Sequence, residues 1–227
     1  MRLLVEKIKI SASLKLMTGL HIGGSKDNVE IGGVDNPVIK IMTDKEKPYI
    51  PGSSLKGKMR CLLEQINGVK LGGSPKINSV FGYTDDKSIS KLIVRDAFLD
   101  DKSVEMLESC DNLDMPYTEN KYENTIDRYT GTTIKGGIRQ TERVPAGVSF
   151  NTEFIINVWK TDDCDEKQDK KNSLLLFKDA VNALENDYLG GSGSRGYGQI
   201  KFENWKFEEA SEETEWNMKL TDSLIIW

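Results

Sequence analysis

Hydrophobic and polar residues alternate along several stretches of the chain. The clearest stretch spans residues 3–16, where the apolar positions Val5, Ile8, Ile10, Ala12, Leu14 and Leu16 lie mostly on one face. Side chains of a strand point alternately to the two faces of a sheet, so this pattern predicts a strand with one buried face. Further strands are predicted at 91–99, 148–159 and 199–207, with shorter extended pieces at 38–42 and 49–51.

Two other segments repeat their apolar residues at the spacing of an amphipathic helix. The apolar positions are Leu55, Met59, Leu62, Leu63 and Ile66 in segment 53–66, and Leu175, Leu176, Ala180, Ala183, Leu184 and Tyr188 in segment 173–188. Residues three or four apart share one face of a helix, so each set predicts a buried stripe. Ser53 or Ser54 is the expected N-cap of the first helix.

Glycine-rich and polar stretches separate these elements. Residues 17–36 carry five glycines and end before Pro37, which predicts a long loop. The polar stretch 100–143 has weak periodicity and a Lys-Gly-Gly turn at 135–137, and we interpret it as an inserted hairpin. Residues 161–172 are expected to form a mobile surface loop.

The predicted elements follow approximately the order βαββαβ, with a long insertion. This order predicts an α+β fold with a ferredoxin-like, split βαβ core and long glycine-rich loops. We expect one domain over residues 1–207, with the insertion at about 100–145. Residues 208–227 form an acidic tail that ends in Leu-Ile-Ile-Trp, and this tail is a candidate docking segment.

The composition is that of a globular protein, because 37% of the 227 residues are hydrophobic and 30% are charged. No apolar run approaches the roughly 20 residues needed to span a bilayer, so no membrane partner is expected. The N-terminus alternates polar and apolar residues, whereas a secretory signal has an uninterrupted apolar stretch. These features predict a cytoplasmic protein.

Cysteine and histidine are too sparse for a zinc site. Cys61, Cys110 and Cys164 lie far apart in the sequence without a Cys-x-x-Cys pair, and the only histidine is His21. A structural zinc ion needs four such ligands at short spacings, so zinc is not expected.

The net charge of -5 conceals a segregated distribution of charges. Acidic residues concentrate in 100–123 and 203–215. The basic residues form two stretches, Lys56, Lys58 and Arg60, and Lys135, Arg139 and Arg143. Phosphate binding needs a positive face, so the pattern is compatible with a local groove for RNA, and also with an ordinary solvated charge face.

The segment 51–60, PGSSLKGKMR, combines a helix N-terminus with two serines and three cations. The free N–H groups of such a terminus favour anions, and cations one turn further along could reach neighbouring phosphates. The alternative is a capped helix with a solvated face.

The glycine-rich segment 190–198, GGSGSRGYG, could bring its backbone close to a ligand, with Arg195 pairing with a phosphate. A nucleotide-binding P-loop is excluded, because no Gly-Lys-Ser/Thr follows. Residues 195–202 also approach the RNA-binding octamer of RRM domains. Gln199 stands where a stacking aromatic belongs, so we interpret this match as chance.

Asp35 precedes Asn36 and Pro37 at the end of the first glycine-rich loop. A turn aspartate that bonds its own backbone is the ordinary interpretation. The functional interpretation is a carboxylate that binds a divalent ion or assists deprotonation of a ribose 2′-OH. His21 has no visible partner and is more typical of a packing or hydrogen-bonding residue than of a catalyst.

Five motifs in a fixed order resemble the RAMP superfamily. They are TGLHIGGS at 18–25, GVDNPVIK at 33–40, IPGSSLKGKMR at 50–60, SVFGY at 79–83 and GGSGSRGYGQIKF at 190–202. The likeness spans about residues 5–205 and is greatest to the backbone subunit of type III-A CRISPR effector complexes. It implies an RRM-like core, a thumb inserted after about residue 100, and several copies stacked in a filament along one guide RNA.

The resemblance also implies roles for individual residues. Those implied to contact RNA are Ser53, Ser54, Lys56, Lys58, Arg60, Gly193, Ser194, Arg195, Gly196, Arg128, Arg139 and His21. The thumb, around 122–139, would interrupt the guide–target duplex and flip a target base. Asp35 would be the catalytic residue and a ligand of a divalent cation, Mg²⁺ or Mn²⁺, while the target's own 2′-OH attacks. Glu119, Glu123 and Asp127 are candidate helpers.

We therefore expect a metal-dependent endoribonuclease subunit of an antiviral complex. Its implied partners are guide crRNA, complementary target RNA, copies of itself and the other subunits, including the large polymerase/nuclease-like one. Two alternatives stay open. One is a non-catalytic guide-RNA scaffold in which Asp35 only shapes a turn, and the other is a RAMP enzyme that processes precursor guide RNA. The latter needs a general acid–base pair, which a lone histidine disfavours.

Overall fold

The computed structural model describes residues 2–24, 36–44, 46–85, 88–113, 115–161, 165–209 and 212–214. The strands are β1 (Leu3–Leu16), β2 (Tyr49–Ile50), β3 (Leu92–Val94), β4 (Ala97–Leu99), β5 (Glu119–Ile126), β6 (Thr133–Arg143), β7 (Ser149–Lys160), β8 (Ile200–Glu209) and β9 (Glu212–Thr214). The helices are α1 (Gly52–Ile66), α2 (Pro75–Phe81), α3 (Asp101–Glu108) and α4 (Glu166–Glu185), with a 3-10 turn at Gly193–Arg195. Asp35 and the Leu-Ile-Ile-Trp end of the predicted tail lie outside the described residues.

The main sheet has the strand order β2-β4-β7-β1-β8-β9, and β3 also pairs with β7. The long central strands are antiparallel neighbours, with Ile8 of β1 opposite Ile156 of β7 and Leu14 opposite Phe202 of β8. The predicted strand 91–99 is divided into β3 and β4. The predicted α+β class is confirmed, and if these two are taken as one interrupted strand, the order with α1 and α4 as crossovers is consistent with the split βαβ arrangement.

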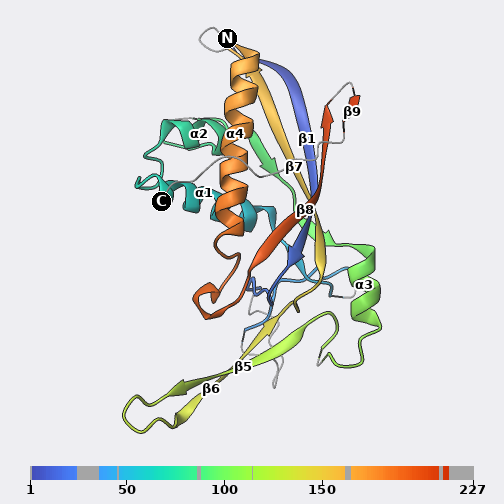
Figure 1. The fold of residues 1–227 in the computed structure, drawn as a ribbon, viewed down its shortest axis with the longest axis vertical. Helices are drawn as coiled ribbons and strands as arrows, with labels where there is room; N and C mark the ends of the chain where they lie inside the picture. Colours follow the sequence, from blue (N-terminus) through green and yellow to red (C-terminus); the bar gives the residue numbers. More distant parts are fainter. Residues whose placement is uncertain are drawn as a thin grey trace.

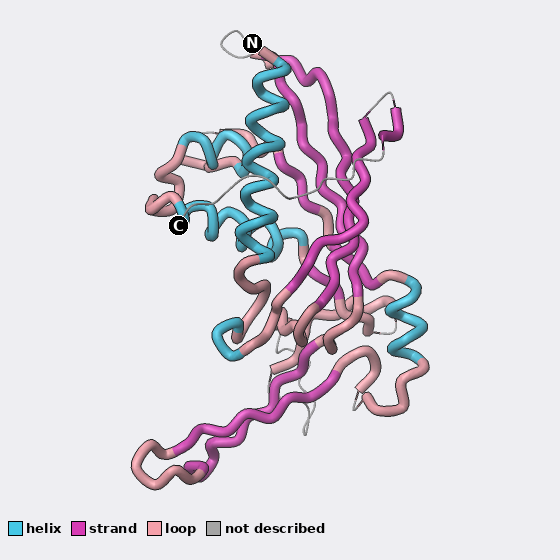
Figure 2. The backbone as a smooth tube through the Cα atoms, in the orientation of Figure 1, coloured by secondary structure: helices cyan, strands magenta, loops and turns pink. Residues whose placement is uncertain are grey.

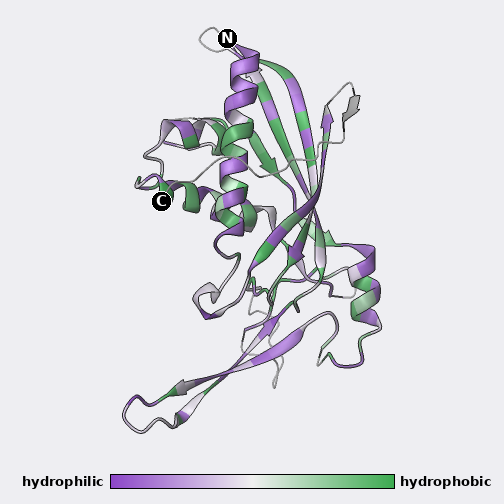
Figure 3. Ribbon diagram, viewed as in Figure 1, coloured by the Kyte–Doolittle hydropathy of each residue, from purple (hydrophilic) through white to green (hydrophobic). Residues whose placement is uncertain are grey.

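Helices α1, α2 and α4 cover one face of the sheet, as Figure 1 shows. The alternating residues of β1 from Ile8 to Leu16 are buried beneath them, together with the predicted stripe of α1 from Leu55 to Leu63. Phe154, Phe177, Phe202 and Trp205 form an aromatic cluster whose ring centroids lie 5.0 to 6.4 Å apart. Figure 3 shows hydrophobic positions alternating with hydrophilic ones along the central strands, as burial of one face of the sheet requires. This burial stabilises the layered core, at about 1.5 to 3 kcal/mol for each large side chain.

Several predicted boundaries are wrong. Ser53 and Ser54 are not the N-cap of α1, because the helix begins at Gly52 and Pro51 takes the cap position. Ile66 was expected in the buried stripe but is 52% exposed, since it is the last residue of the helix. Most of the loop predicted at 161–172 is instead the first turns of α4.

The insertion after residue 100 begins with α3, which its polar sequence did not suggest. A two-stranded hairpin, β5 and β6, follows and extends away from the sheet (Figures 1 and 2). We call this hairpin the thumb. Its turn lies at 127–132, so the Lys-Gly-Gly sequence at 135–137 is part of β6 and the predicted turn position is wrong. No helix in the described part of the chain is long and apolar enough to cross a membrane.

Candidate nucleic-acid interface

The first turn of α1 is packed against the end of β3. The Gly52 N–H donates a hydrogen bond to Asp96 Oδ1 at 2.7 Å, and a side chain at position 52 would overlap the Val94 carbonyl oxygen. Ser53 is exposed and Ser54 is half-buried. An anion at this helix terminus would therefore meet the two serines but would compete with the Asp96 carboxylate for the N–H groups.

Lys56 points from α1 toward the start of β3. Its ammonium donates to Ser90 Oγ at 2.6 Å and to the Leu92 carbonyl oxygen at 2.8 Å. Burial lowers the pKa of Lys56, and the charge of Arg60 lowers it further. In this structure, the Lys56 side chain therefore links α1 to the sheet through hydrogen bonds within the protein.

Arg60 joins α1 to α2 and the loop after it. Its guanidinium pairs with Glu64 at 2.9 Å, and donates to the Gly82 carbonyl oxygen at 2.7 Å and to Asn78 Oδ1 at 3.0 Å. It also lies over the Tyr83 ring, 5.3 Å from the centroid. A guanidinium held on so many sides could contact RNA only by exchanging some of these partners.

Lys58 differs from its two neighbours because it faces the glycine-rich loop. Its ammonium lies 2.9 Å from Asp187 Oδ2 and 3.7 Å from the centroid of the Tyr188 ring. Gly193 packs against the same ring so closely that a side chain there would overlap it. Tyr188 thus brings together Lys58 and the loop, which were singled out separately in the sequence.

A hollow of about 550 Å³ opens beside this contact. Its lining includes Thr18, Tyr188, Gly193, Ser194, Gly196 and Gln199. The carboxylates of Glu185 and Asp187 also face it, and burial raises the pKa of Glu185. The hollow therefore offers backbone and hydroxyl donors together with an aromatic ring, a combination suited to a nucleotide unit of RNA.

The glycine-rich loop at 190–198 lies beside residues 19–21, which belong to the loop predicted at 17–36. The Gly191 N–H donates to the His21 carbonyl oxygen at 2.8 Å, and the Gly198 N–H donates to that of Gly19 at 3.0 Å. Gly190 has a φ of +77°, and a side chain there would overlap the His21 carbonyl oxygen. These contacts explain why glycine occupies the loop, and they place His21 next to it.

The octamer-like stretch within this loop does not present an aromatic platform. Tyr197 and Phe202 are buried, whereas Gln199 is exposed. The open face of the sheet carries charged pairs instead, such as Lys9 between Glu153 and Glu208 at 3.4 and 3.3 Å. The resemblance to the RRM octamer is therefore not matched by RRM-like placement of the rings.

At the base of the thumb, Glu123 binds both Arg139 of β6 and Arg195 of the glycine-rich loop, at 3.2 and 3.1 Å. Burial opposes ionisation of Glu123, but the facing Tyr197 hydroxyl and the two arginines outweigh it, so the pKa of Glu123 is lowered. The Tyr197 ring lies between Lys121 and Arg143, at 4.3 and 5.2 Å from its centroid. The base of the thumb is therefore tied to the loop through charges and one ring.

The remaining thumb candidates are separated from this cluster. Arg128 lies in the exposed turn at the far end of the hairpin. Asp127 accepts hydrogen bonds from the N–H groups of Tyr129 and Thr130, which lower its pKa and shape the turn. Glu119 pairs with Arg143 at 2.6 Å. The three acids considered as helpers thus each have structural partners.

Sequence reasoning missed Glu142, a buried residue of β6. Its carboxylate accepts hydrogen bonds from the Val38 N–H at 2.9 Å and the Thr118 hydroxyl at 2.6 Å, and lies 2.7 Å from the Lys40 ammonium. Its carbonyl oxygen lies 2.7 Å from His21 Nδ1. A carbonyl oxygen only accepts, so Nδ1 carries the hydrogen and His21 is a hydrogen-bonding residue here. A single acid in a basic strand gave no signal for this role.

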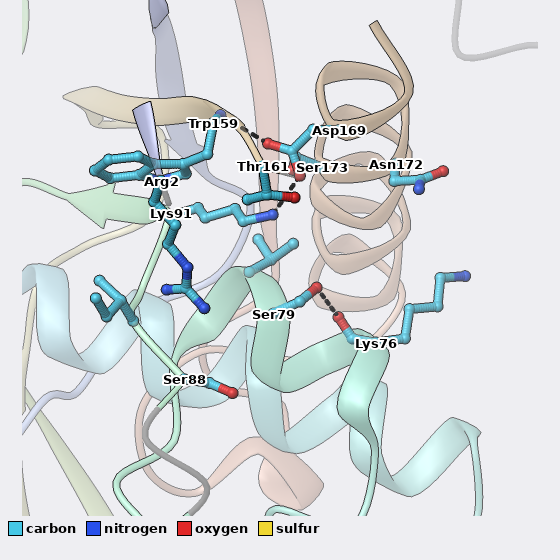
Figure 4. A pocket seen from close by; sticks show the side chains of 12 residues that line it. Arg2, Lys76, Ser79, Ser88, Lys91, Trp159, Thr161, Asp169, Asn172 and Ser173 are labelled. Atoms are coloured by element: carbon cyan, nitrogen blue, oxygen red, sulfur yellow. Dashed lines mark hydrogen bonds and ion pairs between the residues drawn. The ribbon is translucent and has the colours of Figure 1, made fainter. Parts of the chain in front are cut away.

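A second hollow, of about 520 Å³, lies between α2, α4 and the ends of β3 and β7 (Figure 4). Lys91 is paired there with Asp169, which also accepts the Trp159 N–H at 2.9 Å. None of the residues predicted to contact RNA lines it. The second hollow is therefore not part of the predicted groove.

Comparison with known proteins gives consistent matches over most of the chain. A model of the RAMP superfamily matches residues 13–201. The protein of Methanocaldococcus jannaschii named CRISPR system Cms endoribonuclease Csm3 is 44% identical over 214 residues, covering 88% of this chain and 80% of the relative. The protein of the same name from Streptococcus thermophilus is 43% identical over 208 residues, covering 88% and 89%.

Solved structures agree with these matches. A chain in a crystal structure of the Csm3-Csm4 subcomplex in the type III-A CRISPR-Cas interference complex has a TM-score of 0.56 at 31% identity, covering 91% of this chain and 81% of that one. A chain of the type III-B Cmr-beta complex bound to cognate target RNA has a TM-score of 0.58 at 15% identity, covering 89% and 61%. At that identity the second match shows the fold alone.

Proposed function

The chain belongs to the RAMP superfamily, and on that premise we propose that it is a guide-RNA-binding backbone subunit of a type III-A CRISPR complex that cleaves complementary target RNA. Relatives named as endoribonucleases, at 40 to 44% identity, support the activity. A structural neighbour from a type III-A interference complex supports the setting.

The observation that carries the proposal is that Lys58 and the base of the thumb both lie against the glycine-rich loop. Lys58 and Gly193 share the Tyr188 ring, while Arg195 and Arg139 share Glu123. Cations and backbone donors along a groove fit a ribose-phosphate chain, which carries one negative charge per nucleotide. Lys56 and Arg60 would join these contacts by exchanging their internal partners.

The proposed reaction needs no nucleophile from the protein. The 2′-oxygen of a target ribose attacks the adjacent phosphorus, the bond to the 5′-oxygen breaks, and the 2′-OH proton passes to a base while the leaving oxygen gains a proton. The products are a 2′,3′-cyclic phosphate and a 5′-OH. Asp35 is the proposed base and positioning carboxylate for a flipped target nucleotide.

A divalent cation belongs to the proposal as Mg²⁺ or Mn²⁺, and would stabilise charge on the phosphate oxygens. Among the described residues, no group of three or more His, Cys, Asp or Glu side chains could hold such an ion. In this proposal, Asp35 and oxygens of the RNA would hold the cation.

The proposed partners are guide crRNA, complementary target RNA, further copies of this chain and the other complex subunits, including the large polymerase/nuclease-like one. The contribution of neighbouring copies would complete a positive channel that a chain of net charge -5 cannot provide by itself.

The decisive experiment compares wild-type and Asp35→Ala complexes on a labelled target RNA complementary to the guide, with and without a divalent ion. Regularly spaced, metal-dependent products that disappear in Asp35→Ala, with assembly and target binding retained, would support the proposal. Unchanged cleavage by Asp35→Ala would leave this subunit as a guide-RNA scaffold. Specific cleavage of precursor guide RNA by the chain alone would instead favour a processing enzyme.

A further inference from the structure

Glu142 is a fully buried carboxylate at the point where the thumb joins the sheet. Three donors from two other segments meet on it: the Val38 N–H, the Lys40 ammonium and the Thr118 hydroxyl. A buried carboxylate is tolerated only when it is paired and hydrogen-bonded, and this one is. The cost of its burial is therefore offset by contacts that fix the segment 36–40 in place.

The main chain of Glu142 adds two more connections. Its N–H donates to the Asn36 carbonyl oxygen at 3.1 Å, and its carbonyl oxygen accepts the His21 Nδ1 hydrogen at 2.7 Å. The neighbouring Thr141 forms a parallel bridge with Asn36. One residue of the thumb thus holds both the first glycine-rich loop, through His21, and the chain that follows Asp35.

We propose that Glu142 is a positioning residue for the cleavage reaction, which fixes Asn36 to Lys40 and thereby the point at which Asp35 is attached to the fold. The inference rests on the function proposed above, because it assigns Glu142 a role only if Asp35 acts in cleavage. Asp35 is bonded covalently to Asn36, so loosening Asn36 and Val38 loosens the anchor of the catalytic carboxylate. Displacement of a reacting group by about 1 Å is enough to slow a reaction about 100-fold.

Glutamine cannot replace this carboxylate without loss. If its single oxygen accepts from the Val38 N–H, its amide N–H groups face the Thr118 hydroxyl, which can turn to accept, and the Lys40 ammonium, which can only donate. The ion pair with Lys40 disappears as well. The Glu142→Gln variant therefore keeps the size of the side chain and loosens the loop.

Asp169 provides a matched control. It is also buried, pairs with a lysine, Lys91, and accepts a backbone N–H, that of Trp159. It lies at the second hollow (Figure 4), whose lining in the described part of the chain includes no residue of the thumb or of the glycine-rich loops. An Asp169→Asn variant loses the same kinds of contact, so it reports the general effect of weakening a buried ion pair.

The experiment uses reconstituted complexes in excess over a labelled target RNA. It measures the single-turnover cleavage rate at saturation, the target Kd without a divalent ion, and the melting temperature of each subunit variant. We expect Glu142→Gln to cleave about 10- to 100-fold more slowly with target Kd changed less than about twofold. Asp169→Asn should lower the melting temperature to a similar extent and cleave at the wild-type rate.

Each result bears on the proposal. Wild-type cleavage by Glu142→Gln, in an assay where Asp35→Ala is inactive, would overturn the positioning role and leave the proposed function intact. An equal loss of cleavage rate in Asp169→Asn would show that the effect comes from lower stability of the subunit. That result would also overturn the positioning role of Glu142. Normal cleavage by Asp35→Ala would remove the proposed function and this inference together.

If Glu142→Gln does not assemble, Lys40→Met takes its place. That variant removes the ion pair but leaves the Val38 and Thr118 hydrogen bonds to Glu142. We expect cleavage to slow about 3- to 10-fold with target binding unchanged. A wild-type cleavage rate in Lys40→Met would count against the proposal.

Discussion

Glu123 of the thumb and Arg195 of the glycine-rich loop form an ion pair at 3.1 Å, and Arg139 approaches the same carboxylate at 3.2 Å. Both arginines are about half exposed, whereas Glu123 is 11% exposed. The two cations expected to bind phosphate are therefore held by one acid in the absence of RNA. Guide binding would exchange a carboxylate partner for phosphates, and the acid opposes that exchange.

A Glu123→Gln variant should bind guide RNA about three- to tenfold more tightly than wild type at low salt. The substitution removes one negative charge beside the groove and releases two arginines. Since the pKa of Glu123 is lowered, the carboxylate contributes above the ordinary pKa of a glutamate, and its effect is lost only as pH falls through the lowered value. The gain should therefore be equal at pH 6 and pH 8. Titration of a labelled guide at two salt concentrations measures it.

The matched control for charge is Glu208→Gln. Glu208 pairs with Lys9 on the open face of the sheet, remote from the thumb. It should change guide affinity by less than about twofold, because a distant exposed charge is screened by salt. If Glu123→Gln bound guide RNA no more tightly than wild type, the Glu123 carboxylate would not compete with RNA for the two arginines.

Gly198→Ala should destabilise the chain much more than Gly196→Ala. Both positions have positive φ, +71° and +86°, but only at Gly198 would a side chain overlap another residue, at the Leu189 carbonyl oxygen. Gly196→Ala should cost about 1 kcal/mol for backbone strain alone, and Gly198→Ala about 3 kcal/mol or more. Denaturant unfolding of the two variants measures the difference. Similar costs would mean that the chain at position 198 can move away from the Leu189 carbonyl oxygen.

The core was predictable because periodicity follows directly from which face is buried. Residues 3–16 and 148–159 alternate, and the structure pairs them as β1 and β7 at the centre of the sheet. The helix stripe from Leu55 to Leu63 is buried as expected. The short helices α2 and α3 were not predicted, because one or two turns carry too few apolar positions to establish a period.

The residues of the candidate site were easier to predict from the sequence than the contacts between them. Lys58 and the glycine-rich loop were singled out, but their meeting at Tyr188 depends on how α4 returns to the sheet, which no local pattern encodes. Lys56 and Arg60 carry the same charge as Lys58 yet point to internal partners. The role of Glu142 could not be predicted, because its contacts with His21 and Val38 join segments more than 100 residues apart in the sequence.

Tyr117 should titrate near pH 12, well above the value of about 10 for an ordinary tyrosine. Its hydroxyl donates a 2.5 Å hydrogen bond to Glu108, which raises the pKa of Tyr117 most, and burial raises it further. The unfolded chain loses this proton first, so stability should fall as pH rises from about 10 to about 12. Tyrosinate absorbance of wild type, Glu108→Gln and Tyr117→Phe tests the assignment. An early-titrating Tyr117 would mean that the contact between α3 and the base of the thumb is open in solution.

Arg60→Ala should cost the chain about 2 to 4 kcal/mol of stability, and Lys58→Ala about 1 kcal/mol or less. Removing the Arg60 side chain leaves the buried Glu64 without its cation, and leaves the Gly82 carbonyl oxygen without this donor. Removing the Lys58 side chain breaks one surface ion pair and one contact with a ring. Denaturant unfolding of the two variants gives both values.

The same two positions separate a structural cation from an RNA-binding one. Lys58→Ala should weaken guide binding and reduce the salt dependence by about one phosphate contact, because Lys58 already lies beside the glycine-rich loop, over the Tyr188 ring. Arg60→Lys keeps the charge but loses the planar fork that holds Asn78 and the Gly82 carbonyl oxygen, so it should be destabilised. Because Arg60 is proposed to exchange these partners for a phosphate, a folded sample should also bind guide more weakly than wild type. Wild-type guide binding by folded Arg60→Lys would mean that Arg60 keeps its internal partners and has a structural role alone.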